Sequence, residues 1–156
     1  MSNQKPSGEK KAISRDQLAD LLNENLSREY QAIISYVVYS QLLKGAEYMS
    51  IADQLEIHAQ QKLKHALIIS RQIDYLGKMP TVSPKPVRTS EKAKEMLRFD
   101  FENENETIRN YRERVRQCET LGEFASAEQI PQIPYRGAGP PNRFGDGAWR
   151  RCSRRR

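Results

Sequence analysis

Apolar residues recur at intervals of three and four along three long stretches of this chain, which is the spacing that places side chains on one face of an α-helix. The pattern predicts helices over residues 15–44, 47–76 and 90–119. No stretch alternates apolar and polar residues in the way a half-buried strand does. We therefore expect an all-α fold.

Local signals mark both ends of the helical part. Ser14 and Gln17 have the spacing of a capping box, so the first helix should start directly after Ser14. A fourth helix is expected over residues 122–130, where Pro131 and Pro134 cut it short because proline cannot continue a helix. The fourth helix is therefore truncated.

The segment between the second and third helices cannot be helical. Residues 78–89 read KMPTVSPKPVRT and contain three prolines. An extended segment of this length reaches about 37 Å at roughly 3.1 Å per residue, which approaches the length of a whole helix. It can carry the chain from one end of a bundle to the other. The pattern thus predicts a four-helix bundle with one long crossover.

Both ends of the chain differ in composition from the helical domain expected at residues 14–130. Residues 1–13 are polar and are expected to be disordered. Residues 131–156 form an irregular basic tail, and the seven arginines and one aspartate in residues 135–156 account for the whole net charge of +6. No apolar run approaches the roughly 20 residues of a membrane-spanning helix, so we expect a cytoplasmic protein without a membrane partner.

Each of the three long apolar stripes is interrupted by polar residues near its middle. The interruptions are Glu29 in the first helix, Lys62 and His65 in the second, and Glu104 in the third. Burying such groups without partners costs about 1–3 kcal/mol each, so they should meet at one level inside the bundle. Carboxylates with imidazole suit iron, manganese or zinc, and a buried salt-bridge cluster is the alternative.

On these residues the chain resembles the ferritin-like superfamily, and within it bacterioferritin and related small bacterial proteins, over about residues 15–130. Glu29 in SREYQAIISY, His65 in LKHA and Glu104 in MLRFDFENENE look like ligands of that family's di-iron centre. Tyr36 matches the tyrosine beside it, and Lys62 also falls next to the centre. The resemblance implies oxidation of ferrous iron and its storage in a homo-oligomeric shell.

Three residues of the second helix bear on this resemblance. The family's Glu-x-x-His motif needs a carboxylate where Lys62 stands, and a charged lysine has no lone pair for a metal. Lys62 could instead form a salt-bridged core with Glu29 and Glu104. The family's haem-binding methionine would fall at Leu63, so we predict no haem. His58 is expected to be hydrogen-bonded within the bundle rather than to bind metal.

The tail stands where the family carries its second Glu-x-x-His motif. Read one nucleotide later with permitted codons, residues 135–149 can encode Ile-Glu-Glu-Gln-Asp-His-Gln-Ile-Asp-Leu-Ala-Thr-Ala-Leu-Gly, which is amphipathic and contains that motif. We interpret the tail as a frame-shifted fourth helix. Sequencing the coding DNA tests this interpretation.

The sequence leaves three functions open. The first is an iron-binding ferritin-like protein, impaired by Lys62 and by the missing fourth-helix ligands. The second is a non-catalytic ferritin-like bundle with a salt-bridged core. The third uses the basic tail as a nucleic-acid arm, and it ranks last because a frame-shift explains the arginines. A bundle without a full fourth helix should leave the inward stripes partly exposed and so drive association, and we therefore expect a homo-oligomer, a dimer or larger.

Overall fold

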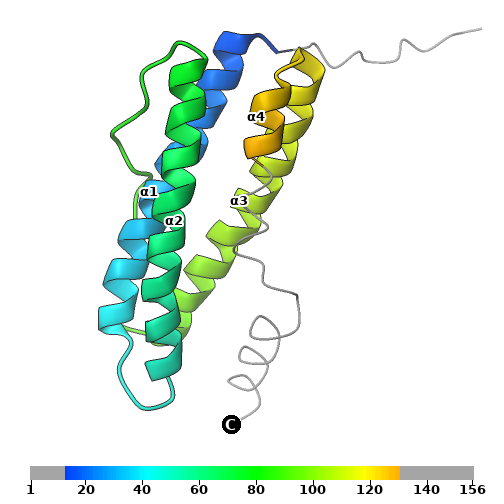
Figure 1. Cartoon of the computed structure of the whole chain (residues 1–156). Coiled ribbons are helices and arrows are strands. Elements are labelled where there is room, and N and C mark those ends of the chain that lie inside the picture. Colours follow the sequence, from blue (N-terminus) through cyan, green and yellow to red (C-terminus); the bar gives the residue numbers. More distant parts are fainter. Residues whose placement is uncertain (1–12, 131–156) are drawn as a thin grey trace, which may run out of the picture.

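A computed structural model describes residues 13–130, which form a bundle of four helices (Figure 1). The helices are α1 (Arg15–Leu42), α2 (Met49–Tyr75), α3 (Ala93–Leu121) and the short α4 (Phe124–Gln129). The all-α prediction, the long crossover and the truncated fourth helix are confirmed. The basic tail and all but the last residue of the N-terminal segment lie outside the described residues, so those predictions are untested.

The start of α1 follows the predicted capping box. Ser14 accepts a hydrogen bond from the Gln17 backbone N–H at 3.1 Å, and the Gln17 side chain accepts one from the Ser14 N–H at 2.9 Å. Ile13, which we had expected to be disordered, packs instead against the core cluster that contains Leu18. These two positions are those of a hydrophobic staple, so ordered chain begins at least one residue before the cap.

The remaining helix ends lie within three residues of their predicted positions. The largest difference is at α3, which begins at Ala93 rather than near residue 90. Ser90 does not cap the helix, because its hydroxyl donates to Glu95 at 2.7 Å and accepts from the Lys92 N–H at 3.0 Å. Gly122, with φ of 74°, ends α3 in the left-handed conformation that favours glycine.

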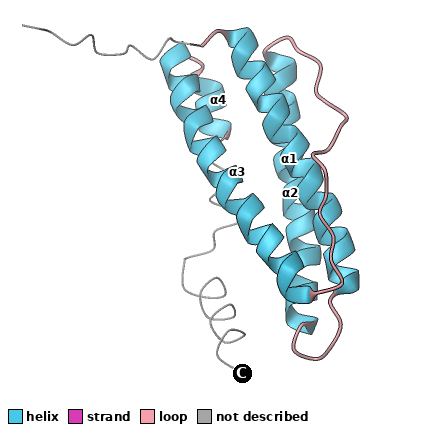
Figure 2. Cartoon of the chain, turned by 180° about the vertical axis from the view of Figure 1, so that it is seen from behind, coloured by secondary structure: helices cyan, strands magenta, loops and turns pink. Residues whose placement is uncertain are grey.

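The crossover between α2 and α3 runs beside α1 (Figure 2) and forms hydrogen bonds with it. The Lys85 N–H donates to the Ser27 carbonyl at 3.0 Å, and the Gln31 amide donates to the Pro86 carbonyl at 2.5 Å. Tyr39 adds a bond from its hydroxyl to the Arg88 carbonyl. The α1 residues in these contacts are about one turn apart from Ser27 to Gln31 and about two turns apart from Gln31 to Tyr39. They fix where the crossover delivers the chain to the start of α3.

The core consists of two apolar clusters on either side of a polar layer. The cluster near the start of α1 includes Leu22, Ile69 and Cys118, and the cluster near its end includes Tyr39 and Met96. The predicted inward stripes supply half of the buried side chains. The polar interruptions lie between the two clusters, at the level expected from the sequence.

Phe101 is an exception to the predicted stripes. Its spacing from Leu97 and Glu104 predicts an inward position, but its side chain is 57 % exposed, so this prediction is wrong. Asp100 takes the inward position instead, one turn after the buried Leu97 and one turn before Glu104. Among the helices of residues 13–130, none is long and apolar enough to span a membrane.

Candidate functional site

Lys62 lies at the centre of the polar layer and joins the three long helices. Its Nζ is 2.5 Å from Oε1 of Glu104 on α3 and 3.9 Å from Oε2 of Glu29 on α1. The Lys62 side chain is 9 % exposed and that of Glu29 is fully buried. The polar residues predicted to converge therefore do so, and a lysine ammonium occupies the space between the two carboxylates.

Two tyrosines hold the carboxylates in a reciprocal arrangement. Tyr36 of α1 donates to Oε1 of Glu104 at 2.8 Å, and Tyr111 of α3 donates to Oε1 of Glu29 at 2.6 Å. In each helix the glutamate and the tyrosine are seven residues apart, or two turns, and so share one face. Because α1 and α3 run antiparallel (Figure 1), each glutamate faces the tyrosine of the other helix.

Tyr111 and Asp100 were not recognised as site residues from the sequence. In the sequence Tyr111 fits the apolar spacing of the third helix, although its spacing from Glu104 repeats that of Tyr36 from Glu29. The inward position of Asp100 gives no signal of its own, because the apolar Phe101 beside it fits the same spacing. Its pKa is raised to about 6 by burial and by the neighbouring Glu104 carboxylate.

The charges in the layer stabilise one another. Burial alone would lower the pKa of Lys62, but the Glu29 and Glu104 carboxylates outweigh it and raise that pKa. Burial would raise the pKa of Glu104, and the Lys62 ammonium lowers it below the ordinary value. Burial, then the adjacent glutamates, raise the pKa of Tyr36 and Tyr111 well above the usual value. The site thus holds Lys62 charged beside an ionised Glu104.

The two histidines of α2 lie at the edge of this arrangement. His65 Nδ1 is 3.4 Å from Oε2 of Glu29, and neither atom has a hydrogen-bond partner among residues 13–130. His58 packs edge-on against the Tyr36 ring with the ring centres 6.0 Å apart. Burial lowers the pKa of His58, which favours a neutral ring. Its expected hydrogen bond stays a prediction.

The donor set does not fit a divalent metal as it stands. The atoms that could bind it, Glu29 Oε2, Glu104 Oε1 and His65 Nδ1, surround or adjoin the Lys62 ammonium, which repels a cation. Within residues 13–130 no three histidine, cysteine, aspartate or glutamate side chains are grouped as a metal site requires. The assignment of Glu29, His65 and Glu104 as ligands stays a prediction.

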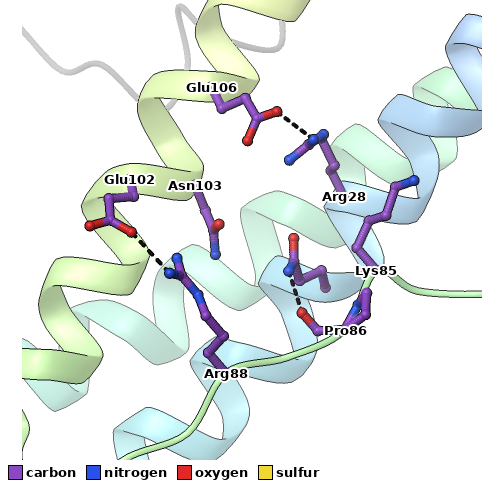
Figure 3. A pocket seen from close by; sticks show the side chains of 8 residues that line it. Arg28, Lys85, Pro86, Arg88, Glu102, Asn103 and Glu106 are labelled. Atoms are coloured by element: carbon purple, nitrogen blue, oxygen red, sulfur yellow. Dashed lines mark hydrogen bonds and ion pairs between the residues drawn. The ribbon is translucent and has the colours of Figure 1, made fainter.

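A second candidate site is a surface hollow of about 490 Å³ between α1, α3 and the crossover (Figure 3). Arg28 pairs with Glu106 at 2.5 Å, and Arg88 pairs with Glu102 at 3.0 Å. Lys85 also lines the hollow and pairs with Glu24. Because each of these cations has a carboxylate partner, the hollow links α3 to α1 and the crossover and presents no free charge for a substrate.

Comparison with known proteins identifies the class. Residues 19–132 match the Ferritin family, described as a ferritin-like domain, so the chain belongs to that family. It is 27 % identical to the bacterioferritin of Brucella melitensis over 127 residues, which are 81 % of this chain and 75 % of that protein.

Two solved structures share the fold. A ferritin-like diiron-carboxylate protein of Bacillus anthracis superposes with a TM-score of 0.75 and 29 % identity over 79 % of this chain and 90 % of that one. The dodecameric, bacterioferritin-related thioferritin of Bacteroides fragilis superposes with a TM-score of 0.72 and 22 % identity, covering 80 % of each chain. The protein is therefore a distant relative of bacterioferritin within the ferritin-like family.

Proposed function

We propose that this protein is a ferritin-like subunit that assembles with copies of itself and, as its sequence stands, does not oxidise ferrous iron at its centre. The observation that carries the proposal is the 2.5 Å contact between Lys62 Nζ and Glu104 Oε1. Ferrous iron is the substrate that family resemblance implies. In this chain the place between the glutamates already holds a positive charge.

The repulsion between the Lys62 ammonium and a ferrous ion is large enough to decide whether iron binds. Two unit charges 4 Å apart interact by about 4 kcal/mol at an effective dielectric constant of 20, and a divalent ion doubles that. A penalty of this size corresponds to several orders of magnitude in affinity. The second candidate function is an iron-oxidising protein with residual activity, and it is favoured only by Glu29, His65 and Glu104 standing at the family's ligand positions.

We expect the full chain to oxidise ferrous iron no faster than buffer. The measurement is the ferric absorbance that develops after ferrous iron is added in air, with bovine serum albumin at equal mass concentration as the control. Turnover that is fast and proportional to protein concentration would establish the iron-oxidising alternative.

The surface that favours self-association lies on the outer side of α1 and α2. The Gln41 amide of α1 donates to Glu56 Oε1 of α2 at 3.2 Å, which marks where the antiparallel helices meet at this surface. Counting turns from that contact places Ile34 opposite Leu63. The large apolar side chains exposed there are Ile34, Val37, Leu63 and Leu67, between 41 % and 54 % exposed.

We infer that a second copy of the chain covers this α1–α2 face. Contiguous exposed apolar surface of this kind marks an interface, and a self-complementary patch gives a two-fold dimer. The patch is on the outer face, whereas the sequence suggested that the inward stripes would drive association. Most residues of those stripes are buried within the subunit.

Light scattering should report a dimer or larger species for the full chain. Val37→Glu combined with Leu63→Glu should shift the equilibrium toward monomer by at least about ten-fold, because two charges would be buried at the interface. Met79→Glu is the matched control, since Met79 is exposed in the crossover and away from this face. A monodisperse monomer for the unmodified chain would contradict the inference.

A further inference from the structure

Arg114 of α3 is a buried cation that forms no ion pair with a carboxylate of residues 13–130. It is 8 % exposed, and its Nη1 donates to the Gln117 side chain at 2.5 Å. Its Nε is buried and has no hydrogen-bond partner among those residues. Burial lowers the pKa of Arg114, and the attraction of the adjacent Glu113 does not offset it. Because a guanidinium does not lose its proton in proteins, a positive charge is buried here that the described side chains do not balance.

A second unpartnered donor, Asn25, faces α3 from α1. Asn25 is 2 % exposed, and its Nδ2 is buried without a hydrogen-bond partner among residues 13–130. It precedes Glu29 by one turn, and Glu29 accepts a bond from Tyr111 of α3 at 2.6 Å. Arg114 is one turn after Tyr111 on α3, which runs antiparallel to α1 (Figure 1). Asn25 and Arg114 therefore lie at one level of the contact between these helices, which we call the α1–α3 seam.

The other polar side chains near this level supply no counter-charge within the described part of the chain. Arg28 of α1 pairs with Glu106 at 2.5 Å. Cys118, one turn after Arg114, is a buried free thiol, and burial is the main cause that raises its pKa to about 11. The thiol is therefore neutral at pH 7. Two N–H donors and one unbalanced positive charge thus face the same seam.

We propose that the α1–α3 seam binds a small monovalent anion such as chloride, held by Arg114 Nε and Asn25 Nδ2. One negative charge balances one guanidinium, and hydrogen bonds with a charged partner are stronger than neutral ones. Phosphate fits less well, because its four oxygens need more donors than the two unpartnered ones described at this level. The bound anion ties α3 to α1 one turn from the bond between Tyr111 and Glu29. The inference does not depend on the iron chemistry proposed above.

Thermal unfolding of the full chain in sodium chloride and in sodium gluconate tests this proposal. Equal ionic strength in the two salts keeps the screening of surface charges the same. An anion that binds only the folded state raises the melting temperature. We expect the chain to melt at least about 2 °C higher in about 0.2 M chloride than in gluconate, and bromide to act like chloride. The chloride NMR line should broaden in proportion to protein concentration, which reports binding directly.

Arg114→Met removes the guanidinium and keeps a long apolar side chain. It should abolish the difference between the two salts and reduce the broadening of the chloride line at least about five-fold. In gluconate the variant should melt no lower than the unmodified chain, because it no longer buries an unbalanced charge. Arg109→Met is the matched control, since it removes an exposed arginine of the same helix, and it should leave the chloride response unchanged.

Equal melting temperatures in chloride and gluconate for the unmodified chain would overturn the proposal. So would an equal chloride response in Arg114→Met, which would indicate a general salt effect. Asp146 is the only acid in the sequence of residues 131–156, and Asp146→Asn should respond to chloride as the unmodified chain does. A chloride response that appears only in Asp146→Asn would show that this carboxylate balances Arg114, and would also overturn the proposal. Circular dichroism checks that each variant keeps its helices.

Discussion

Replacing Lys62 with methionine is expected to lower the free energy of unfolding by about 3–5 kcal/mol, the usual cost of removing one partner of a buried ion pair. Methionine keeps most of the volume of the side chain but removes the ammonium that contacts Glu104 and faces Glu29. Glu29 is fully buried, so its carboxylate would be left with Tyr111 as its hydrogen-bond donor. Urea denaturation of the full chain measures the change.

Two further variants separate charge from packing. Lys64→Met on the same helix removes an exposed lysine and should change stability by no more than about 0.5 kcal/mol. Combining Lys62→Met with Glu29→Gln should recover part of the loss, because a neutral amide costs less to bury than an unpaired carboxylate. A loss of less than about 1 kcal/mol for Lys62→Met would show that the central ion pair does not stabilise the fold.

The contribution of the Lys62 ion pair to the free energy of unfolding should fall at high pH. The folded state raises the pKa of Lys62 above its ordinary value of 10.5. The stabilisation is therefore fully present below pH 10.5 and is lost as the pH rises through the higher folded pKa. The difference between the unmodified chain and Lys62→Met should be constant at neutral pH.

Replacing Lys62 with glutamate is expected to make the stability of the protein depend on metal. The change removes the repelling ammonium and adds a carboxylate beside Glu29, His65 and Glu104. Without metal, the clustered carboxylates should lower the melting temperature below that of the unmodified chain. Mn²⁺ or Zn²⁺ should raise it again, by an amount equivalent to about 2.7 kcal/mol at one hundred times the dissociation constant.

The unmodified chain should melt at the same temperature with Mn²⁺, with Zn²⁺ and with EDTA. Lys64→Glu controls for the added negative charge, because position 64 is exposed, and it should show no metal dependence either. Ferrous oxidation by Lys62→Glu should stay weak without a fourth helix that carries ligands. Equal stabilisation of the unmodified chain by Mn²⁺ would disprove the proposal that the Lys62 ammonium keeps metal ions out of the site.

The sequence predicted the fold well because its signals are local. The capping box of Ser14 and Gln17, the prolines of the crossover and the apolar spacing each act within a few residues, and each has the expected structural effect. The convergence of Glu29, Lys62 and Glu104 was also predictable, since each lies at the middle of a stripe. Packing the stripes side by side brings the three to one level.

The features that the sequence did not reveal depend on the rotation of a helix about its axis and on contacts between residues far apart in the chain. Whether Asp100 or Phe101 faces inward is a matter of one residue, or 100° about the helix axis, and periodicity alone did not distinguish them. The bond between Tyr111 and Glu29 joins residues 82 positions apart and requires the antiparallel alignment of α1 and α3 to be known. The hydrogen bonds of the crossover to α1 likewise depend on tertiary position.

The hydrogen bonds from Tyr36 to Glu104 and from Tyr111 to Glu29 also restrict how α1 and α3 can be aligned. Sliding α3 by two turns in one direction would bring Glu29 opposite Glu104, two carboxylates in the buried layer, and would leave both tyrosine hydroxyls without their acceptors. Sliding it by two turns in the other direction would bring Tyr36 opposite Tyr111 and separate both glutamates from their donors. The apolar residues at helical spacing would tolerate such shifts, but the two polar pairs do not, so they select a single register from several that the hydrophobic surface alone would permit.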